Sequence, residues 1–133
     1  MSQENVELFL EVLRCAEAKD ADGVAGLLHP EIRSTAVRGW PEPGPFLGRD
    51  AVVAQFKRNV ADWEDNRFID IDVVADEGDW VVAEFRWEVR GAGSGIDTHF
   101  DVAAAIRVRD ARIIEWHYRW NQAEALEAAG LKE

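Results

Sequence analysis

Hydrophobic side chains in the first half of the chain recur three and four residues apart, which is the spacing of amphipathic helices. This pattern predicts two long helices over residues 3–19 and 49–63. A short helix is predicted between Asp22, its expected N-cap, and Pro30, because proline cannot continue a helix. A brief strand over residues 31–37 and a loop rich in proline and glycine complete the first half.

In the second half the period of the pattern changes to two, which is typical of strands with two unlike faces. Four strands are predicted, over residues 67–76, 79–91, 97–109 and 111–120. Asn121 and Glu124 then form a capping box for a final helix, and Gly130 is placed at its C-terminal cap. The order of elements predicts an α+β fold, in which a cone-shaped, curved antiparallel sheet wraps around the N-terminal helices.

Composition limits the classes of partner. The 133 residues form a chain of single-domain size, and residues 1–133 are expected to be one domain. The formal net charge is −11, from 26 acidic and 15 basic residues, which argues against nucleic acid and anionic membranes because both need a positive patch. No apolar run reaches the ~18 residues of a membrane span, and the N-terminus lacks the basic start of a signal peptide. A cytoplasmic location is therefore expected.

Three charged residues share one face of the strand over residues 79–91. Glu84, Arg86 and Glu88 are spaced by two, so their side chains point the same way. If this face lines a pocket, Arg86 would hold the carboxylates ionised and Glu88 would act as a general base. The apolar residues of the strand occupy its other face, however, and such a pattern also fits charges that face water. The sequence leaves both registers open.

The last strand carries aromatic residues on one face. Trp116, Tyr118 and Trp120 alternate with charged residues and align with the apolar Phe100 and Val102 of the preceding strand. Three aromatic side chains with one hydroxyl suit the wall of a pocket for a flat organic ligand. They suit an ordinary aromatic core equally well.

Two histidines, His99 and His117, fall on the opposite faces of these strands and are expected to lie near each other on the outer surface. A role as acid–base partner to Asp101 or Glu115 competes with an exposed or interface position. No His, Cys or Asp cluster in the sequence has metal-ligand spacing, and no phosphate or dinucleotide loop is present. Neither a metal nor a cofactor is expected.

Three segments carry a family resemblance: GPFLGRDAV before the third helix, RGAGSG between two strands, and AEALEAAGL at the end. With these segments the chain resembles, over nearly its whole length, the SnoaL-like branch of the nuclear transport factor 2-like superfamily. That superfamily includes polyketide cyclases, ketosteroid isomerases and limonene epoxide hydrolases. The resemblance implies a cystatin-like α+β barrel with a deep apolar pocket, and a homodimer formed through the outer face of the sheet.

The resemblance also bears on the site. Arg86-Trp-Glu88 looks like the Arg-x-Asp pair of limonene epoxide hydrolases, and Tyr118 stands where that family has a further catalytic carboxylate. The leading hypothesis is that a small apolar or polycyclic molecule binds in the cone, with cofactor-free acid–base catalysis of the isomerase, cyclase or hydrolase type by Arg86, Glu88 and Tyr118. The expected binding residues are Trp40, Phe56, Glu84, Phe100, Val102, Trp116 and Trp120. The alternative is a non-catalytic ligand-binding or dimeric interaction domain.

Overall fold

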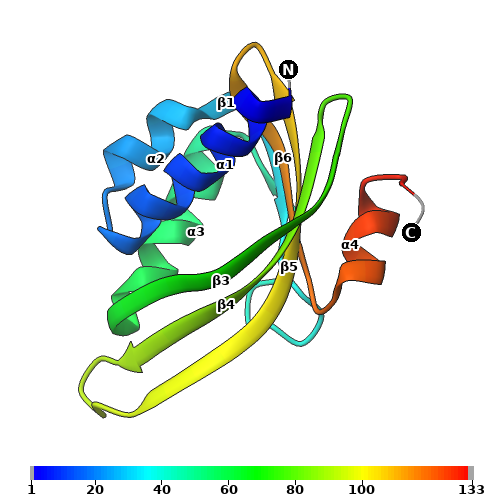
Figure 1. The fold of residues 1–133 in the computed structure, drawn as a ribbon. Helices are drawn as coiled ribbons and strands as arrows, with labels where there is room; N and C mark the ends of the chain where they lie inside the picture. Colours follow the sequence, from blue (N-terminus) through cyan, green and yellow to red (C-terminus); the bar gives the residue numbers. More distant parts are fainter. Residues whose placement is uncertain (1, 132–133) are drawn as a thin grey trace.

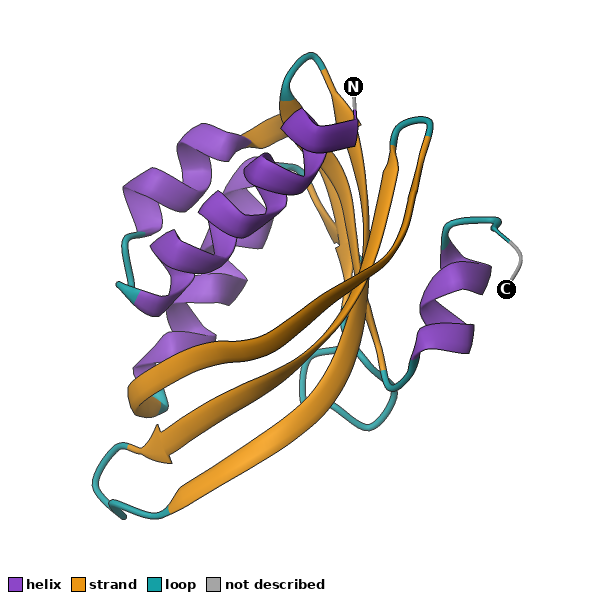
Figure 2. Ribbon diagram, in the orientation of Figure 1, coloured by secondary structure: helices purple, strands orange, loops and turns teal. Residues whose placement is uncertain are grey.

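In residues 2–131, which the computed structural model describes, three helices lie against the concave face of a curved, six-stranded sheet, and a fourth lies against its convex face (Figures 1 and 2). The helices are α1 (Ser2–Glu17), α2 (Ala21–Leu27), α3 (Arg49–Ala61) and α4 (Gln122–Ala128). The strands are β1 (Leu28–Thr35), β2 (Phe46–Leu47), β3 (Trp63–Glu77), β4 (Trp80–Gly91), β5 (Asp97–Arg109) and β6 (Arg112–Arg119). The predicted α+β fold is confirmed.

The strand order is β2-β1-β6-β5-β4-β3. Strands β3 to β6 pair antiparallel in chain order, as short turns between them require. The first strand, β1, pairs parallel with β6, and the helix and strands between them in sequence supply the long connection that a parallel pair needs. The described edge strands β2 and β3 do not pair with each other, so the expected barrel is an open, curved sheet.

The helix ends follow local capping chemistry. The N-cap of α2 is Asp20, whose carboxylate accepts a hydrogen bond from the Gly23 amide at 2.9 Å, so the prediction of Asp22 is wrong by two residues. Asn121 is confirmed as the N-cap of α4, since the Glu124 amide donates to its Oδ1 at 2.9 Å. The Glu124 carboxylate accepts from Nδ2 of Asn121 at 3.3 Å, and not from its backbone amide as in a full capping box. Gly130 ends α4 in the left-handed region, with φ at 73°.

Strand β4 is buried on both faces over its first half. Val81 and Ala83 pack on the concave side against the helices, and each is 1% exposed. Val82 points the other way and joins a second cluster, in which Leu126 and Ala125 of α4 pack on the convex side. The parity of β4 therefore assigns odd-numbered residues to the concave face and even-numbered residues to the convex face.

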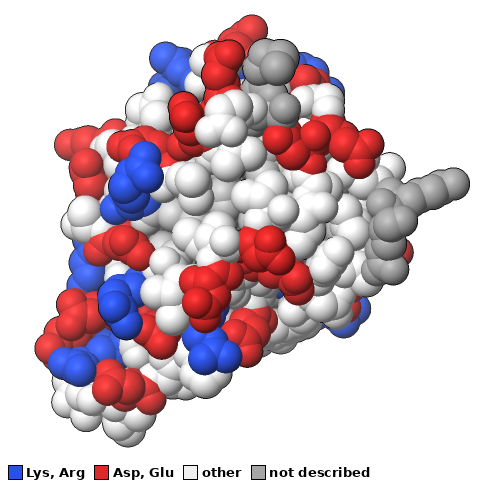
Figure 3. All heavy atoms as spheres, in the orientation of Figure 1, with Lys and Arg blue, Asp and Glu red and all other residues white. Residues whose placement is uncertain are grey.

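Acidic and basic side chains are interspersed on the face of the described residues shown in Figure 3, around a central uncharged area. None of the helices in the described range is long and apolar enough to cross a bilayer. The expected lack of nucleic-acid and membrane partners stays a prediction.

Candidate functional site

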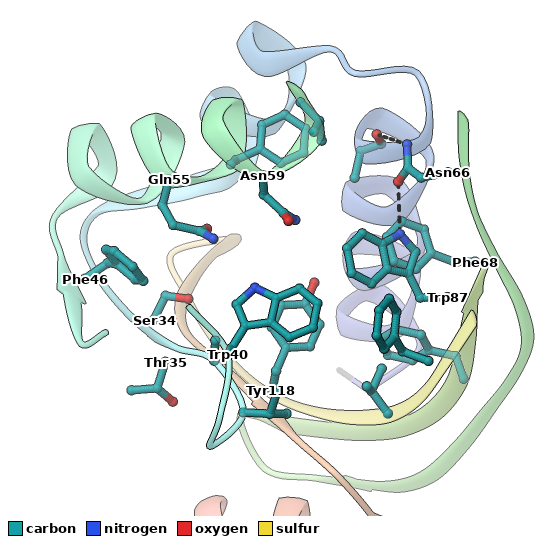
Figure 4. Close-up of a pocket in the computed structure, with 18 residues that line it drawn as sticks. Ser34, Thr35, Trp40, Phe46, Gln55, Asn59, Asn66, Phe68, Trp87 and Tyr118 are labelled. Carbon is teal, nitrogen blue, oxygen red and sulfur yellow. Dashed lines mark hydrogen bonds between the residues drawn. The ribbon is translucent and has the colours of Figure 1, made fainter. Parts of the chain in front are cut away.

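A cavity of about 110 Å³ lies between the concave face of the sheet and α3, with the loop over residues 36–45 along its border (Figure 4). Eight of the eighteen described residues that line it are aromatic. The aromatic side chains that line it are Trp40, Phe46, Phe56, Phe68, Phe85, Trp87, Phe100 and Tyr118. Such a concave, largely apolar wall with a few polar groups is typical of small-molecule sites.

The register of the sheet brings the aromatic wall together. Phe85 of β4 pairs with Val102 of β5, and Trp87 pairs with Phe100, so all four side chains project from the concave face. Trp40 inserts from the loop and packs edge-on against Phe100, with ring centroids 5.2 Å apart. Edge-to-face and offset aromatic pairs of this kind are favourable. The loop is therefore anchored on the sheet through its tryptophan.

Asn66 of β3 holds one part of this wall in place. It is a buried polar residue, and its Oδ1 accepts a hydrogen bond from Nε1 of Trp87 at 3.2 Å. Its Nδ2 donates to the carbonyl oxygen of Ala16 in α1 at 3.4 Å. Both ends of the amide are thus used inside the protein, which makes Asn66 a positioning residue for the Trp87 ring.

A polar group of side chains lies at the other end of the cavity. Gln55 and Asn59, one turn apart on α3, direct their amides towards Trp40 and Tyr118 (Figure 4). Within the described part of the chain, neither amide has a hydrogen-bonding side-chain or backbone partner in the structure. Burial raises the pKa of the Tyr118 hydroxyl, so this group stays protonated and can donate a hydrogen bond.

The described residues that line the cavity are all uncharged, since they are apolar, aromatic, hydroxyl or amide side chains. A charged ligand would therefore lose its hydration without gaining an ion pair from the wall. The described residues also contain no cluster of His, Cys, Asp and Glu that could hold a metal ion. The arrangement suits a neutral ligand held by packing and hydrogen bonds.

The predicted charged group lies outside the cavity. Glu84, Arg86 and Glu88 occupy the convex face, because the parity that buries Phe85 and Trp87 turns them outward. Their predicted place in the pocket is wrong. A register that turned the three charged residues inward would expose Phe85 and Trp87 to water, and burial of these two aromatic rings is more favourable.

The charges on this face pair across strands. Nε of Arg86 donates to Oδ1 of Asp101 at 2.9 Å, and Arg67 pairs with Glu88. The expected homodimer through this face stays a prediction.

The other residues predicted for the site fall into two groups, those that line the cavity and those that do not. Trp40, Phe56, Phe100, Val102 and Tyr118 line the cavity, and their predicted roles in binding or catalysis stay predictions.

The other two tryptophans lie elsewhere. Trp116 packs in the core beside Phe9, with ring centroids 5.4 Å apart, instead of lining the cavity. Trp120 follows the end of β6, is 38% exposed and donates through Nε1 to the Arg38 carbonyl. Sequence reasoning missed Gln55 and Asn59, whose only signal is that they lie four residues apart beside the apolar Phe56 on α3.

A separate polar network lies on the convex side of the sheet. Nδ1 of His117 lies 2.8 Å from Oγ1 of Thr35, and its Nε2 lies 2.9 Å from Oε1 of Glu115. Burial lowers the pKa of His117, against the opposing effect of Glu115. The Glu115 carboxyl is partly buried, which raises its pKa, but hydrogen bonds from His117 and Arg107 outweigh this and hold the pKa below its usual value.

This network is remote from His99. On β5, His99 pairs with Glu88, whereas His117 pairs with Ala105, six residues further along the same strand. The prediction that the two histidines lie near each other is therefore wrong. His117 is 6% exposed and His99 is exposed, so the two side chains also differ in environment.

The same architecture occurs in solved structures. An NTF2-like protein of unknown function from Burkholderia pseudomallei matches with a TM-score of 0.75 and 22% identity over 93% of this chain and 95% of that one. A proposed isomerase from Bacillus subtilis gives a TM-score of 0.78 and 20% identity over 98% and 95%. A proposed polyketide cyclase from Xanthomonas campestris pv. campestris gives 0.73 and 23% over 92% and 94%. The fold is that of the NTF2-like α+β proteins.

Within this class the sequence itself identifies the family. The profile of the SnoaL-like domain matches residues 6–116. Because the match covers most of the chain, the protein belongs to the SnoaL-like family. No curated protein sequence matches the chain.

Proposed function

We propose that this SnoaL-like protein binds a small, apolar, ring-containing molecule in the cavity between the sheet and α3. The observation that carries the proposal is the wall itself, to which eight aromatic side chains contribute and whose described lining is uncharged throughout. Removing apolar surface from water contributes roughly 25 cal/mol per Å², so a ring that fills this space gains affinity from burial alone.

The volume limits the size of the ligand. At about 110 Å³ the cavity is smaller than the ~150 Å³ engineered cavity that binds benzene, so it holds at most a single ring, and a substituent on that ring needs room at the border formed by the loop over residues 36–45. A polycyclic ligand would require the loop over residues 36–45 to move outwards. Trp40 opposes that movement, because its ring packs against both Phe100 and Trp87.

Catalysis by Glu88 and Arg86 is not part of this proposal, because both residues lie on the convex face. Among the three residues expected to be catalytic, Tyr118 lines the cavity. Its raised pKa makes it a neutral hydrogen-bond donor and a poor base. Non-catalytic ligand binding is therefore the function that the geometry favours.

Isothermal titration calorimetry with toluene tests the proposal. Val60→Phe, on α3, places extra volume in the cavity, and Glu84→Gln on the convex face is the matched control. Toluene is expected to bind the wild type and Glu84→Gln, to raise the Tm of both, and to lose binding to Val60→Phe. A thermal melt tests whether Val60→Phe is folded. If Val60→Phe does not fold, Val102→Ile on the opposite wall replaces it as the variant with a filled cavity. Equal binding to a folded, filled variant, or no binding to the wild type, would overturn the proposal.

A further inference from the structure

The polar side chains at one end of the cavity indicate which functional group the ligand has, which the aromatic side chains do not. We propose, building on the ligand-binding function above, that the cavity recognises a neutral aromatic carbonyl compound, with the carbonyl oxygen accepting hydrogen bonds from Tyr118, Asn59 and Gln55. The ring would lie against Phe100 and the neighbouring aromatic side chains.

Gln55, Asn59 and Tyr118 converge on one end of the cavity. Gln55 and Asn59 are four residues apart, so they lie on one face of α3 and reach the cavity side by side. Tyr118 approaches from β6 on the opposite wall, and the hydroxyl end of its ring lies below the Asn59 amide (Figure 4). One atom placed between these walls can contact side chains from both.

These side chains lack partners inside the protein. In the described residues the amides of Gln55 and Asn59 make no hydrogen bond, whereas the nearby Asn66 amide uses both of its ends. The Gln55 and Asn59 side chains are half-buried, so a ligand that fills the cavity would displace water from their amides. Leaving the amides without a partner would cost free energy, so this end of the cavity favours a polar atom of the ligand.

The cavity lining also discriminates by charge. The described lining offers no cation to a carboxylate and no anion to an amine, so an ionised ligand would be desolvated without compensation. Carbonyl oxygen is a strong acceptor that stays neutral over the physiological pH range. The uncharged lining therefore favours a neutral ligand.

The donors at this end of the cavity favour a carbonyl. The indole N–H of Trp40, at this end of the cavity in Figure 4, can only donate, and Tyr118 stays protonated and has its own O–H to donate. Each amide has both a donor and an acceptor and can turn its NH₂ group towards the ligand. An oxygen that only accepts can therefore be bound by every one of these groups.

Four probes of similar size separate the possibilities by calorimetry. Acetophenone has the carbonyl, 1-phenylethanol replaces it with a hydroxyl, ethylbenzene has no oxygen, and benzoate is charged. Acetophenone is expected to bind about tenfold more tightly than ethylbenzene, as one or two net hydrogen bonds would give, with 1-phenylethanol between them and benzoate weakest.

Variants then assign the preference to side chains. Tyr118→Phe and Asn59→Leu are each expected to lower the affinity for acetophenone several-fold towards that for ethylbenzene, and to leave the affinity for ethylbenzene unchanged. The carbonyl stretching frequency of bound acetophenone is expected to rise in Tyr118→Phe, because a hydrogen bond to the oxygen is lost. Glu84→Gln, on the convex face, is expected to match the wild type in every measurement.

The outcomes distinguish this inference from the function on which it rests. If ethylbenzene and acetophenone bind equally, or if 1-phenylethanol or benzoate binds best, the carbonyl assignment is overturned while ring binding stands. If none of the four probes binds, the proposed ligand-binding function itself is wrong. If both Tyr118→Phe and Asn59→Leu still prefer acetophenone, these two side chains do not bind the carbonyl oxygen.

Discussion

Nε1 of Trp87 donates a hydrogen bond to Oδ1 of Asn66, 3.2 Å away, and so joins two neighbouring strands at the cavity wall. The same amide reaches α1 by donating to the carbonyl of Ala16. Because Asn66 is 5% exposed and Trp87 is 9% exposed, neither group can exchange its partner for bulk water without local opening. One buried amide therefore ties the sheet, the first helix and the cavity together.

Replacing this amide tests its structural role. Asn66→Leu is expected to lower the free energy of unfolding by about 1–3 kcal/mol, because the indole N–H of Trp87 and the carbonyl of Ala16 lose their partner in a buried position. Urea denaturation measures the change. Asn66→Asp keeps an acceptor for Trp87 and is expected to leave the tryptophan fluorescence nearer to that of the wild type. A neutral effect of Asn66→Leu would show that the pair contributes nothing.

The convex network predicts a pH dependence of stability. Burial lowers the folded-state pKa of His117 below its usual value of 6.5, so the unfolded chain binds a proton more readily than the folded protein does. Stability from this group is complete above pH 6.5 and is lost as the pH falls through 6.5 towards the lower folded pKa. Glu115 opposes the shift, while Arg33 and Arg119 add to it. Chemical denaturation at pH 7.5, 6.5 and 5.5 is expected to show the decline.

The assignment of that decline to one side chain needs a matched pair of variants. His117→Gln is expected to flatten the pH dependence between 7.5 and 5.5, and His99→Gln, on the exposed part of β5, is expected to keep it. The carboxylates contribute at lower pH: the pKa of Glu115 is held below its usual value of 4.5, so its contribution is present above pH 4.5 and is lost as the pH falls below it. A decline that persists in His117→Gln would place its origin elsewhere.

An ion pair fastens the loop beside the cavity to α3. Arg58 donates from Nε to Glu42 at 3.1 Å and from Nη2 at 2.7 Å, which is a bidentate arrangement. Both side chains are exposed, so Arg58→Gln is expected to change global stability little. Ligand exchange should be faster in this variant if the loop over residues 36–45 opens to admit the ligand. Stopped-flow fluorescence with acetophenone measures both rate constants, and unchanged rates would contradict the role of the loop.

The cap of α4 gives a prediction that is independent of the ligand. Oδ1 of Asn121 accepts a hydrogen bond from the amide of Glu124 at 2.9 Å. Asn121→Ala is expected to cost about 1 kcal/mol, and Asn121→Ser is expected to restore most of it because serine is also a good N-cap. Thermal denaturation distinguishes the two. If both variants lose the same amount, the cap is not the source of the effect.

The sequence allowed the fold to be predicted because its signals are local. The strand pattern of β4 and the Asn121 cap of α4 depend only on neighbouring residues, and the strand and the cap both appear in the structure. The site depends on which face of β4 turns inward, and that choice is made by distant partners. Apolar Phe85 and Trp87 meet Phe68 of β3 and Phe100 of β5, and the charged face of β4 is left to the solvent side.

Gln55 and Asn59 are a clearer example of site residues that could not be predicted from the sequence. Polar residues on a helix normally face water, and the stripe of apolar residues on α3 gave no reason to place them elsewhere. In the structure none of the side chains of α3 is fully buried, and the helix leaves room for a cavity beneath it instead of packing tightly on the sheet. The polar end of the cavity thus arises from how far α3 stands from the strands, which no local pattern encodes.

The two faces of the sheet can be compared in a final test. Glu88→Gln removes a charge from the pair with Arg67 on the convex face, and Phe100→Ala removes part of the cavity wall. Glu88→Gln is expected to leave the affinity for acetophenone within twofold of the wild type, since Glu88 is not among the described residues that line the cavity. Phe100→Ala is expected to weaken binding at least tenfold, because a buried aromatic ring supplies more than about 1.4 kcal/mol of contact. Calorimetry on both variants measures these affinities. Weaker binding in Glu88→Gln with no change in Phe100→Ala would show that the ligand binds at the charged convex face.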